Sequence, residues 1–128
     1  MIVLDASVLV AYLDREDEHH DRAEALLARE IDDDFVINPL TLAEVLVVPA
    51  RDGRLDEVRA TLHDLEIGEL PFPADAGAEL ARIGAGTRLK MPDCCVLLAA
   101  EDAKARLASF DDRLRRVAAA RKIVVVDG

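Results

Sequence analysis

The sequence predicts an α/β domain of three layers, in which helices cover both faces of a mostly parallel sheet. Apolar segments with the length of strands alternate with segments of helical periodicity along the chain. Hydrophobic residues make up 52% of the chain but aromatic residues only 3%, so Ala, Val, Leu and Ile must build the core. With 128 residues and no repeat or linker, we expect a single domain over residues 1–128.

The first elements are a strand, two helices and a second strand. Residues 2–4 are an apolar strand, followed by a helix over residues 8–13 for which Ser7 is available as the N-cap. A second helix over residues 20–30 has its apolar side chains on one face, and an acidic turn ends it. Residues 35–37 are apolar and partly β-branched, which predicts the second strand.

The middle of the chain is expected to be helical. Asn38 is a suitable N-cap and Pro39 a suitable first residue for a helix that Pro49 and Asp52-Gly53 are expected to end. Further helices are predicted over residues 55–65 and 76–83, with an extended piece at 67–70 between them. Gly84 and Gly86 are expected to loosen the chain after the last of these helices.

The last third repeats the alternation of helices and strands. Pro92 opens an almost wholly apolar helix over residues 94–103, with Asp93 in its first turn. Strands are predicted over residues 106–109 and 123–126, with a short basic helix over residues 114–120 between them.

The charge and the cysteines limit the classes of function. A net charge of −10 and a pI near 4.7 argue against nucleic-acid binding by general electrostatic attraction, so any such role must be local. Cys94 and Cys95 are adjacent and cannot bridge a loop, which suits reduced core residues in a reducing compartment. No basic leader precedes the first apolar run, and no run has membrane-spanning length, so we expect a cytoplasmic protein without membrane contact.

Carboxylates occupy positions that a sheet of this kind would bring together. Asp5 and Asp111 follow predicted strands, and the carboxyl ends of parallel strands meet at one edge. Glu44 lies in the second turn of the helix after the second strand, so it can reach the same edge. Asp93 has no such derivation and stands out only as an acid that opens a buried helix. Each acid also has a plainer interpretation: helix capping for Asp5, a solvated helix residue for Glu44, a helix-dipole partner for Asp93 and a turn for Asp111.

The sequence resembles the PIN-domain ribonucleases, and among them the VapC-type toxins of toxin–antitoxin pairs. The resemblance covers essentially the whole chain, because several motifs occur in the family's order and spacing. These motifs are Val3-Leu4-Asp5-Ala6-Ser7, Leu40-Thr41-Leu42-Ala43-Glu44-Val45, Met91-Pro92-Asp93 before an apolar helix, and Leu107-Ala108-Ser109-Phe110-Asp111.

The resemblance implies a PIN-like domain whose acidic site falls on Asp5, Glu44, Asp93 and Asp111. Such acids suit Mg²⁺, or Mn²⁺ in its place, which prefers oxygen ligands and can activate water against a phosphodiester. The resemblance further implies cleavage of RNA, a basic antitoxin partner and a homodimer. Many members carry another acid where this chain has Arg113, so whether Asp112 acts as a ligand, and whether one or two ions bind, stays open.

Other hypotheses remain beside the nuclease. A non-catalytic PIN-like module would bind a partner or regulate its operon, and an aspartate-based phosphoryl-transfer domain would also place acids at strand ends. His19 and His20, among several acids, suggest either a transition-metal site or a surface helix start. A basic run after the fourth acid suggests either contacts to an RNA backbone or a solvated helix face. This run consists of Arg113, Arg115, Arg116, Arg121 and Lys122.

Overall fold

The structure is a computed structural model that describes residues 1–127. Helices and strands alternate along the chain much as the sequence predicts. In chain order the elements are β1 (Ile2–Leu4), α1 (Ala6–Leu13), α2 (His20–Arg29), β2 (Phe35–Ile37), α3 (Pro39–Arg51), α4 (Leu55–Asp64), β3 (Gly68–Glu69), α5 (Ala76–Thr87), α6 (Met91–Ala103), β4 (Arg106–Ala108) and α7 (Asp112–Ala120).

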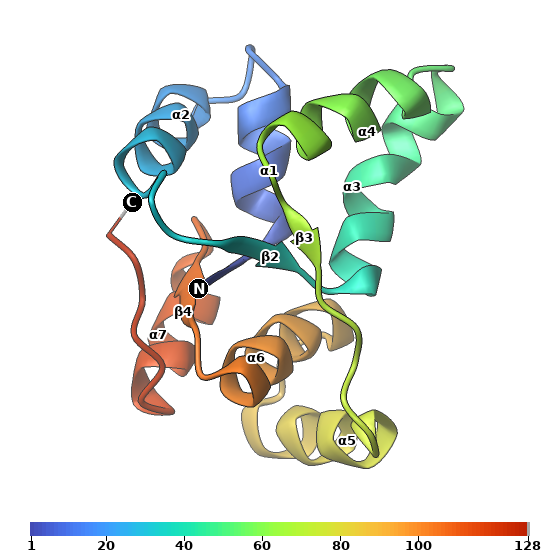
Figure 1. Cartoon of the computed structure of the whole chain (residues 1–128). Helices are drawn as coiled ribbons and strands as arrows, with labels where there is room; N and C mark the ends of the chain where they lie inside the picture. The colour runs from blue at the N-terminus through green and yellow to red at the C-terminus, as the bar shows by residue number, and fades with distance from the viewer. Residues whose placement is uncertain (128) are drawn as a thin grey trace.

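The strands form a parallel sheet in the order β3-β2-β1-β4 (Figure 1). The central strand β1 pairs with β2 on one side and with β4 on the other, so that Val3 lies between Val36 and Leu107. Since all strands run the same way, residues that follow β1 and β4 emerge at the same edge of the sheet.

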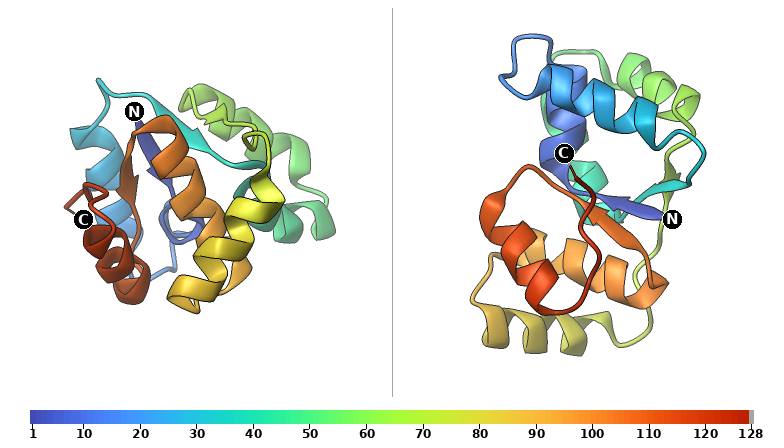
Figure 2. Two further views of the ribbon diagram at one scale, coloured as in Figure 1. Left: turned by 90° about the horizontal axis from the view of Figure 1, so that it is seen from below. Right: turned by 90° about the vertical axis from the view of Figure 1, so that its left-hand side faces the viewer.

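Helices cover both faces of the sheet, which confirms the predicted three-layer α/β class (Figure 2). Ile2 and Leu4 point into a hydrophobic cluster with side chains of α1, α2, α3 and α4. Val3 points the opposite way, into a second cluster formed with α5, α6 and α7. This alternation is the period of two that a strand imposes on its side chains, and it explains why a strand with two covered faces is wholly apolar.

The predicted strand over residues 123–126 is wrong in extent. Only Val125 forms a bridge, with Leu107, supported by bonds from Leu107 N to Val124 O (2.9 Å) and from Val126 N to Leu107 O (2.8 Å). The reason is the length of β4, which has three residues. The backbone N–H and C=O of its middle residue, Leu107, point away from β1. Leu107 is therefore the residue of β4 that pairs with the last segment.

Two expected helix breakers lie inside helices. Pro49 lies inside α3, which ends at Arg51 with Asp52 as its C-cap, as the Asp52-Gly53 pair predicted. Asp52 N and Arg54 N bond the carbonyls of Val48 (3.0 Å) and Pro49 (2.7 Å). The expected loosening at Gly84 is also wrong, since α5 continues to Thr87. A Cβ built on Gly84 would lie 3.8 Å from Cys94 Sγ, so this glycine faces the neighbouring helix α6.

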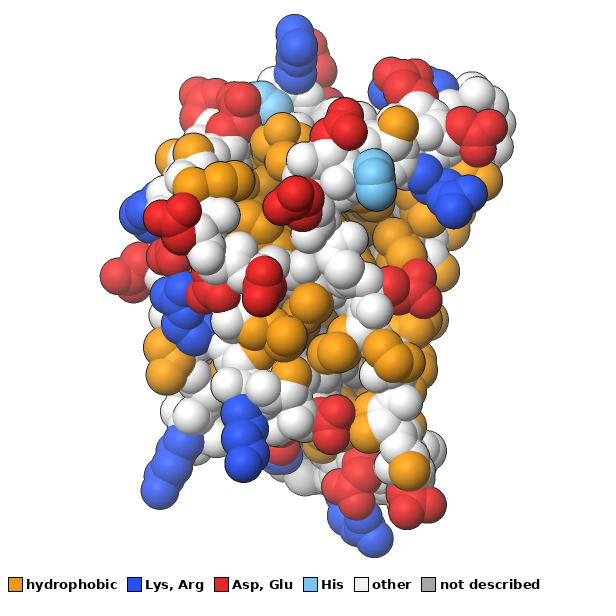
Figure 3. All heavy atoms as spheres, in the orientation of Figure 1, with side chains coloured by type: hydrophobic (Ala, Val, Ile, Leu, Met, Phe, Trp, Pro, Cys, Tyr) orange, Lys and Arg blue, Asp and Glu red, His pale blue; other side chains and the backbone are white. Residues whose placement is uncertain are grey.

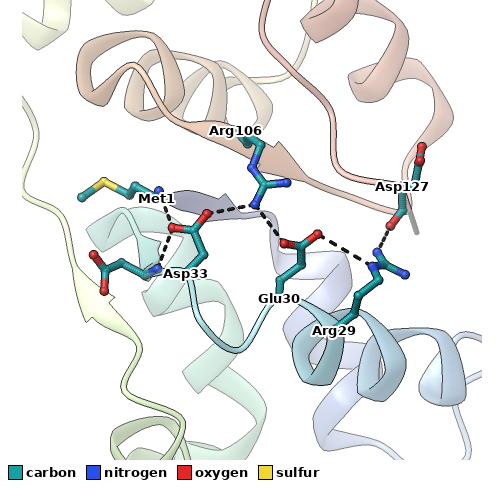
Figure 4. Close-up of polar contacts among 7 residues, drawn as sticks. Met1, Arg29, Glu30, Asp33, Arg106 and Asp127 are labelled. Carbon is teal, nitrogen blue, oxygen red and sulfur yellow. Dashed lines mark hydrogen bonds and ion pairs between the residues drawn. The ribbon is translucent and has the colours of Figure 1, made fainter.

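The amino ends of β1 and β4 are joined by a network of ion pairs (Figure 4). Asp33 accepts from the Met1 ammonium (2.5 Å) and from Arg106 (2.9 Å), and Arg106 also reaches Glu30 (2.9 Å). These partners lower the pKa of Asp33 and of Glu30 below their ordinary values. The network fixes the loop before β2 at the sheet edge opposite to the one where Asp5 emerges.

The surface carries scattered charges. On the face drawn in Figure 3, basic side chains lie among acidic ones and do not form one broad basic field.

Cys94 and Cys95 are buried free thiols, and burial raises the pKa of both. Within residues 1–127, the helices are too short or too polar to cross a membrane.

Candidate functional site

Asp5 is a buried carboxylate at the carboxyl end of the central strand. Its backbone N–H donates to Ala108 O (2.9 Å), which extends the pairing of β1 and β4 by one step. Asp5 is only 7% exposed and directly precedes α1. Asp5 occupies the N-cap position, but its carboxylate accepts no cap hydrogen bond from the helix. Helix capping therefore does not explain the buried charge, and the expectation of Ser7 as N-cap is wrong.

A pair of serines holds one oxygen of this carboxylate. Ser7 Oγ and Ser109 Oγ each donate to Asp5 Oδ2 at 2.7 Å. Each hydroxyl also accepts a backbone N–H from the loop after β4: Phe110 N donates to Ser7 (3.0 Å) and Asp111 N to Ser109 (3.0 Å). Because Oδ2 is occupied in this way, Oδ1 is the oxygen of Asp5 that is left to face a ligand.

Asp111 lies at the same edge, after β4, and begins α7 as its N-cap. Its Oδ1 accepts from Leu114 N at 2.9 Å. One oxygen of Asp111 therefore caps α7, where the plainer interpretation of the sequence was a turn. The serine frame, defined as Ser7 and Ser109 with their bonds, connects Asp5 to the backbone of Asp111, so the two carboxylates are fixed relative to each other.

Glu44 reaches this edge from α3. The helix starts at Pro39, directly after β2, and Asn38 caps it by accepting from Thr41 N at 2.9 Å. Burial and the charge of Asp5 raise the pKa of the Glu44 carboxyl. The charge effect places Glu44 within electrostatic range of Asp5.

Asp93 completes the group from the first turn of α6. The pKa of its carboxyl is raised by burial first, then by the charges of Asp5, Asp111 and Glu44, while Lys90 lowers it. Asp93 therefore feels all three of the other predicted site acids. The structure brings together Asp5, Glu44, Asp93 and Asp111, a set named here the four-acid site.

The carboxylates of the four-acid site are near one another without forming a close cluster. No three of its acids, in the described part of the chain, have carboxylate oxygens all within 4.8 Å of one another. The charges of neighbouring acids still raise the pKa of Asp93 and of Glu44, and a cation among the carboxylates would reverse that effect. Carboxylate oxygens are the ligands that hard divalent ions prefer.

The residues after Asp111 take different positions. Asp112 is exposed and is the first residue of α7, and Arg113 donates to Arg88 O at 3.4 Å. Arg115 Nη1 donates to the carbonyls of Ser109 (3.0 Å) and Val126 (3.2 Å), which makes it a link between the site loop and the last segment. Arg121 pairs with Glu101. These contacts weaken the hypothesis that the basic run as a whole meets an RNA backbone.

Sequence reasoning missed the part that Ser109 plays. Ser109 is fully buried, yet its hydroxyl bonds a residue 104 positions away in the chain. The available signal was a serine directly after a buried apolar strand, where an unpaired hydroxyl would be costly. Ser7 donates to the same oxygen of Asp5 from the first turn of α1.

Comparisons with known proteins agree with this geometry. The family model described as PIN domain matches residues 2–120. No curated protein sequence matches the chain. Among solved structures, FitAcB from Neisseria gonorrhoeae aligns with a TM-score of 0.74 and 21% identity over 99% of this chain and 97% of that one. VapC20 from Mycobacterium tuberculosis, described as a sarcin-ricin loop cleaving toxin, aligns with a TM-score of 0.74 and 17% identity over 100% of both chains.

A third solved structure, VapBC2 from Rickettsia felis bound to a DNA fragment from their promoter, aligns with a TM-score of 0.71. It is 14% identical over 98% of both chains. At these identities the structural matches show a shared fold. The family match spans β1 through α7 and includes every acid of the four-acid site. The chain belongs to the PIN domain family.

Proposed function

We propose that the protein is a metal-dependent endoribonuclease and acts as the toxin of a type II toxin–antitoxin pair. The observation that carries the proposal is the four-acid site, in which Asp93 lies within electrostatic range of Asp5, Glu44 and Asp111. PIN domain membership supports the same function, as do structural neighbours described as a toxin and as a toxin–antitoxin complex.

The residues present fit Mg²⁺, with Mn²⁺ as a substitute. All side chains of the four-acid site are carboxylates, and no other residue type is needed to complete an oxygen ligand set with water. Burial and mutual repulsion raise the pKa of Asp93 and of Glu44, so keeping the group ionised favours a bound cation. We assign Asp5, Glu44, Asp93 and Asp111 as the residues that would hold the ion.

The chain's own residues prepare this site for phosphodiester hydrolysis. A bound divalent ion would supply Lewis-acid activation of water and neutralise charge on the phosphodiester. The serine frame orients Asp5 before any ligand arrives, because Oδ2 already accepts bonds from Ser7 and Ser109. The frame also fixes the backbone of Asp111 through Ser109, which reduces the reorganisation that ligand binding requires.

The substrate, partner and assembly follow from the comparisons and the charge. VapC20 is described as cleaving the sarcin-ricin loop, which favours structured RNA as the substrate class here. Neighbours solved as toxin–antitoxin complexes favour an antitoxin partner, and a net charge of −10 suits a basic one. A cytoplasmic location and a homodimer complete the proposal.

Incubation of the purified chain with total cellular RNA tests the function. The expected result is cleavage in Mg²⁺ or Mn²⁺ that stops in EDTA and in Asp5→Asn. Asp64→Asn, an exposed acid on α4, is the matched control and should cleave like the wild type. Cleavage by Asp5→Asn, or cleavage in EDTA, would overturn the mechanism. RNA binding without cleavage would favour the non-catalytic PIN-like module.

A further inference from the structure

We infer that the start of α2 is a second metal site, which takes Zn²⁺ or a similar transition ion through His20, Asp21 and Glu24. Each of these residues offers one ligand atom, and these atoms all lie within 4.8 Å of one another. Among residues 1–127 this is the one group of at least three His, Cys, Asp or Glu side chains that meets this distance. The site does not depend on the nuclease proposal.

The ring of His20 is already oriented as a metal ligand. Its Nδ1 lies 2.8 Å from Ala11 O, and because a carbonyl can only accept, Nδ1 must carry the hydrogen. Nε2, which faces Glu24, is therefore the nitrogen that a metal would coordinate, in place of any hydrogen that it shares with Glu24. Metal-bound histidines usually donate their other ring N–H to a carbonyl or carboxylate in this way. The side chain is only 15% exposed, so packing also restricts the ring.

The carboxylates are placed at a suitable distance from Nε2. Glu24 lies one helical turn after His20, and its Oε1 is 3.0 Å from Nε2. Two ligands that are each about 2 Å from a zinc ion lie about 3 Å apart, which matches this separation. Asp21 supplies a third ligand, and water would take the fourth position of a tetrahedral ion.

The donor set separates this site from the four-acid site. An imidazole nitrogen with carboxylates suits zinc and its neighbours, whereas Mg²⁺ selects oxygen ligands alone. Asp17 and Glu18 lie just before α2, so the local charge also favours a cation. The ion would fix the start of α2 to α1, because the Ala11 carbonyl that holds the His20 ring belongs to α1.

The position also reaches the neighbourhood of Asp111. The ring of His19 lies 5.3 Å from that of Phe110, and the guanidinium of Arg22 lies 4.7 Å from the same ring. Phe110 directly precedes Asp111 in the chain. Neighbours of His20 on both sides thus contact the residue that precedes Asp111.

NMR of the histidine side chains tests the inference directly, since the chain has only three histidines. On addition of one equivalent of Zn²⁺ to the full chain, the ¹⁵N signal of His20 Nε2 should move to that of a metal-bound nitrogen. His63, on α4, should not change, and Mg²⁺ should leave all of the rings unchanged.

Variants locate the bound ion. His20→Gln should weaken Zn²⁺ binding by about 10-fold or more, and Glu24→Gln, an exposed change that keeps the ring, should also weaken it. His63→Gln should bind like the wild type. If His20 and His63 shift alike, or if both site variants bind Zn²⁺ as tightly as the wild type, the site is not at His20 and the inference fails. If Zn²⁺ does not displace the His20–Glu24 ion pair, changes at His20 and Glu24 will leave Zn²⁺ binding as tight as in the wild type.

Discussion

Removal of the Ser109 hydroxyl tests whether the serine frame supports the four-acid site. In Ser109→Ala, Asp5 Oδ2 keeps a single donor, Ser7, and the N–H of Asp111 loses its acceptor. A buried polar group without a partner costs about 1–3 kcal/mol. For a domain of this size we expect a loss of about 3–5 °C in Tm per kcal/mol, and therefore a decrease of about 3–15 °C.

The loss should also weaken metal binding. Outer-shell partners of metal ligands typically contribute about 10- to 100-fold in affinity, so Mg²⁺ binding measured by calorimetry should weaken by that factor. Thr61→Ala is the matched control, because its exposed hydroxyl bonds only a helix carbonyl, at 3.2 Å. Wild-type Tm together with wild-type Mg²⁺ affinity in Ser109→Ala would refute the reasoning.

Three further predictions concern charge and backbone. The pKa of Asp93 is raised, so its ionised form destabilises the metal-free fold as pH rises above the ordinary range of an aspartate. In EDTA, Asp93→Asn should therefore raise Tm at pH 7 and not at pH 4. A lower Tm of the variant at pH 7 would contradict this. The pKa values of Glu30 and Asp33 are lowered, so the stabilisation from their ionised forms is present at neutral pH and is lost as pH falls through the lowered values. Arg106→Gln should unfold at lower urea concentration than the wild type at pH 7, and the two proteins should become more alike in acid. A gap between the two proteins that does not depend on pH would contradict this. Gly84→Ala should increase the free energy of unfolding by about 0.5–1 kcal/mol, because Gly84 is helical and a Cβ there has only ordinary contacts. If the variant is instead less stable in urea, α5 and α6 pack too closely at this position to accept a methyl group.

Local sequence signals predicted the alternation of elements well. The apolar runs became β1 and β2, and the Asn38-Pro39 pair started α3. The failures occurred where tertiary structure overrode a local rule. Gly84 lies inside α5 on the side that faces α6 and does not break the helix, and the short strand β4 limits its last neighbour to one bridge.

The candidate site was predictable in part for the same reason. Asp5 and Asp111 follow from the rule on strand ends, and Glu44 follows from the helix after β2. Asp93 came from the family resemblance, since α6 begins after a helix and a loop. The contribution of Ser109 depends on a side-chain bond between β1 and the loop after β4, and a single sequence does not show which side chains meet across a sheet.

The most direct test of the central claim is the rate of RNA cleavage by single amide variants of the four acids. One RNA that the wild type cleaves in Mg²⁺ should be used under single-turnover conditions, with circular dichroism to confirm folding. The proposal predicts that Asp5→Asn, Glu44→Gln, Asp93→Asn and Asp111→Asn each cleave at least about 100-fold more slowly. A folded Asp5→Asn or Asp93→Asn variant that cleaves at the wild-type rate would contradict a metal-dependent nuclease built on these acids.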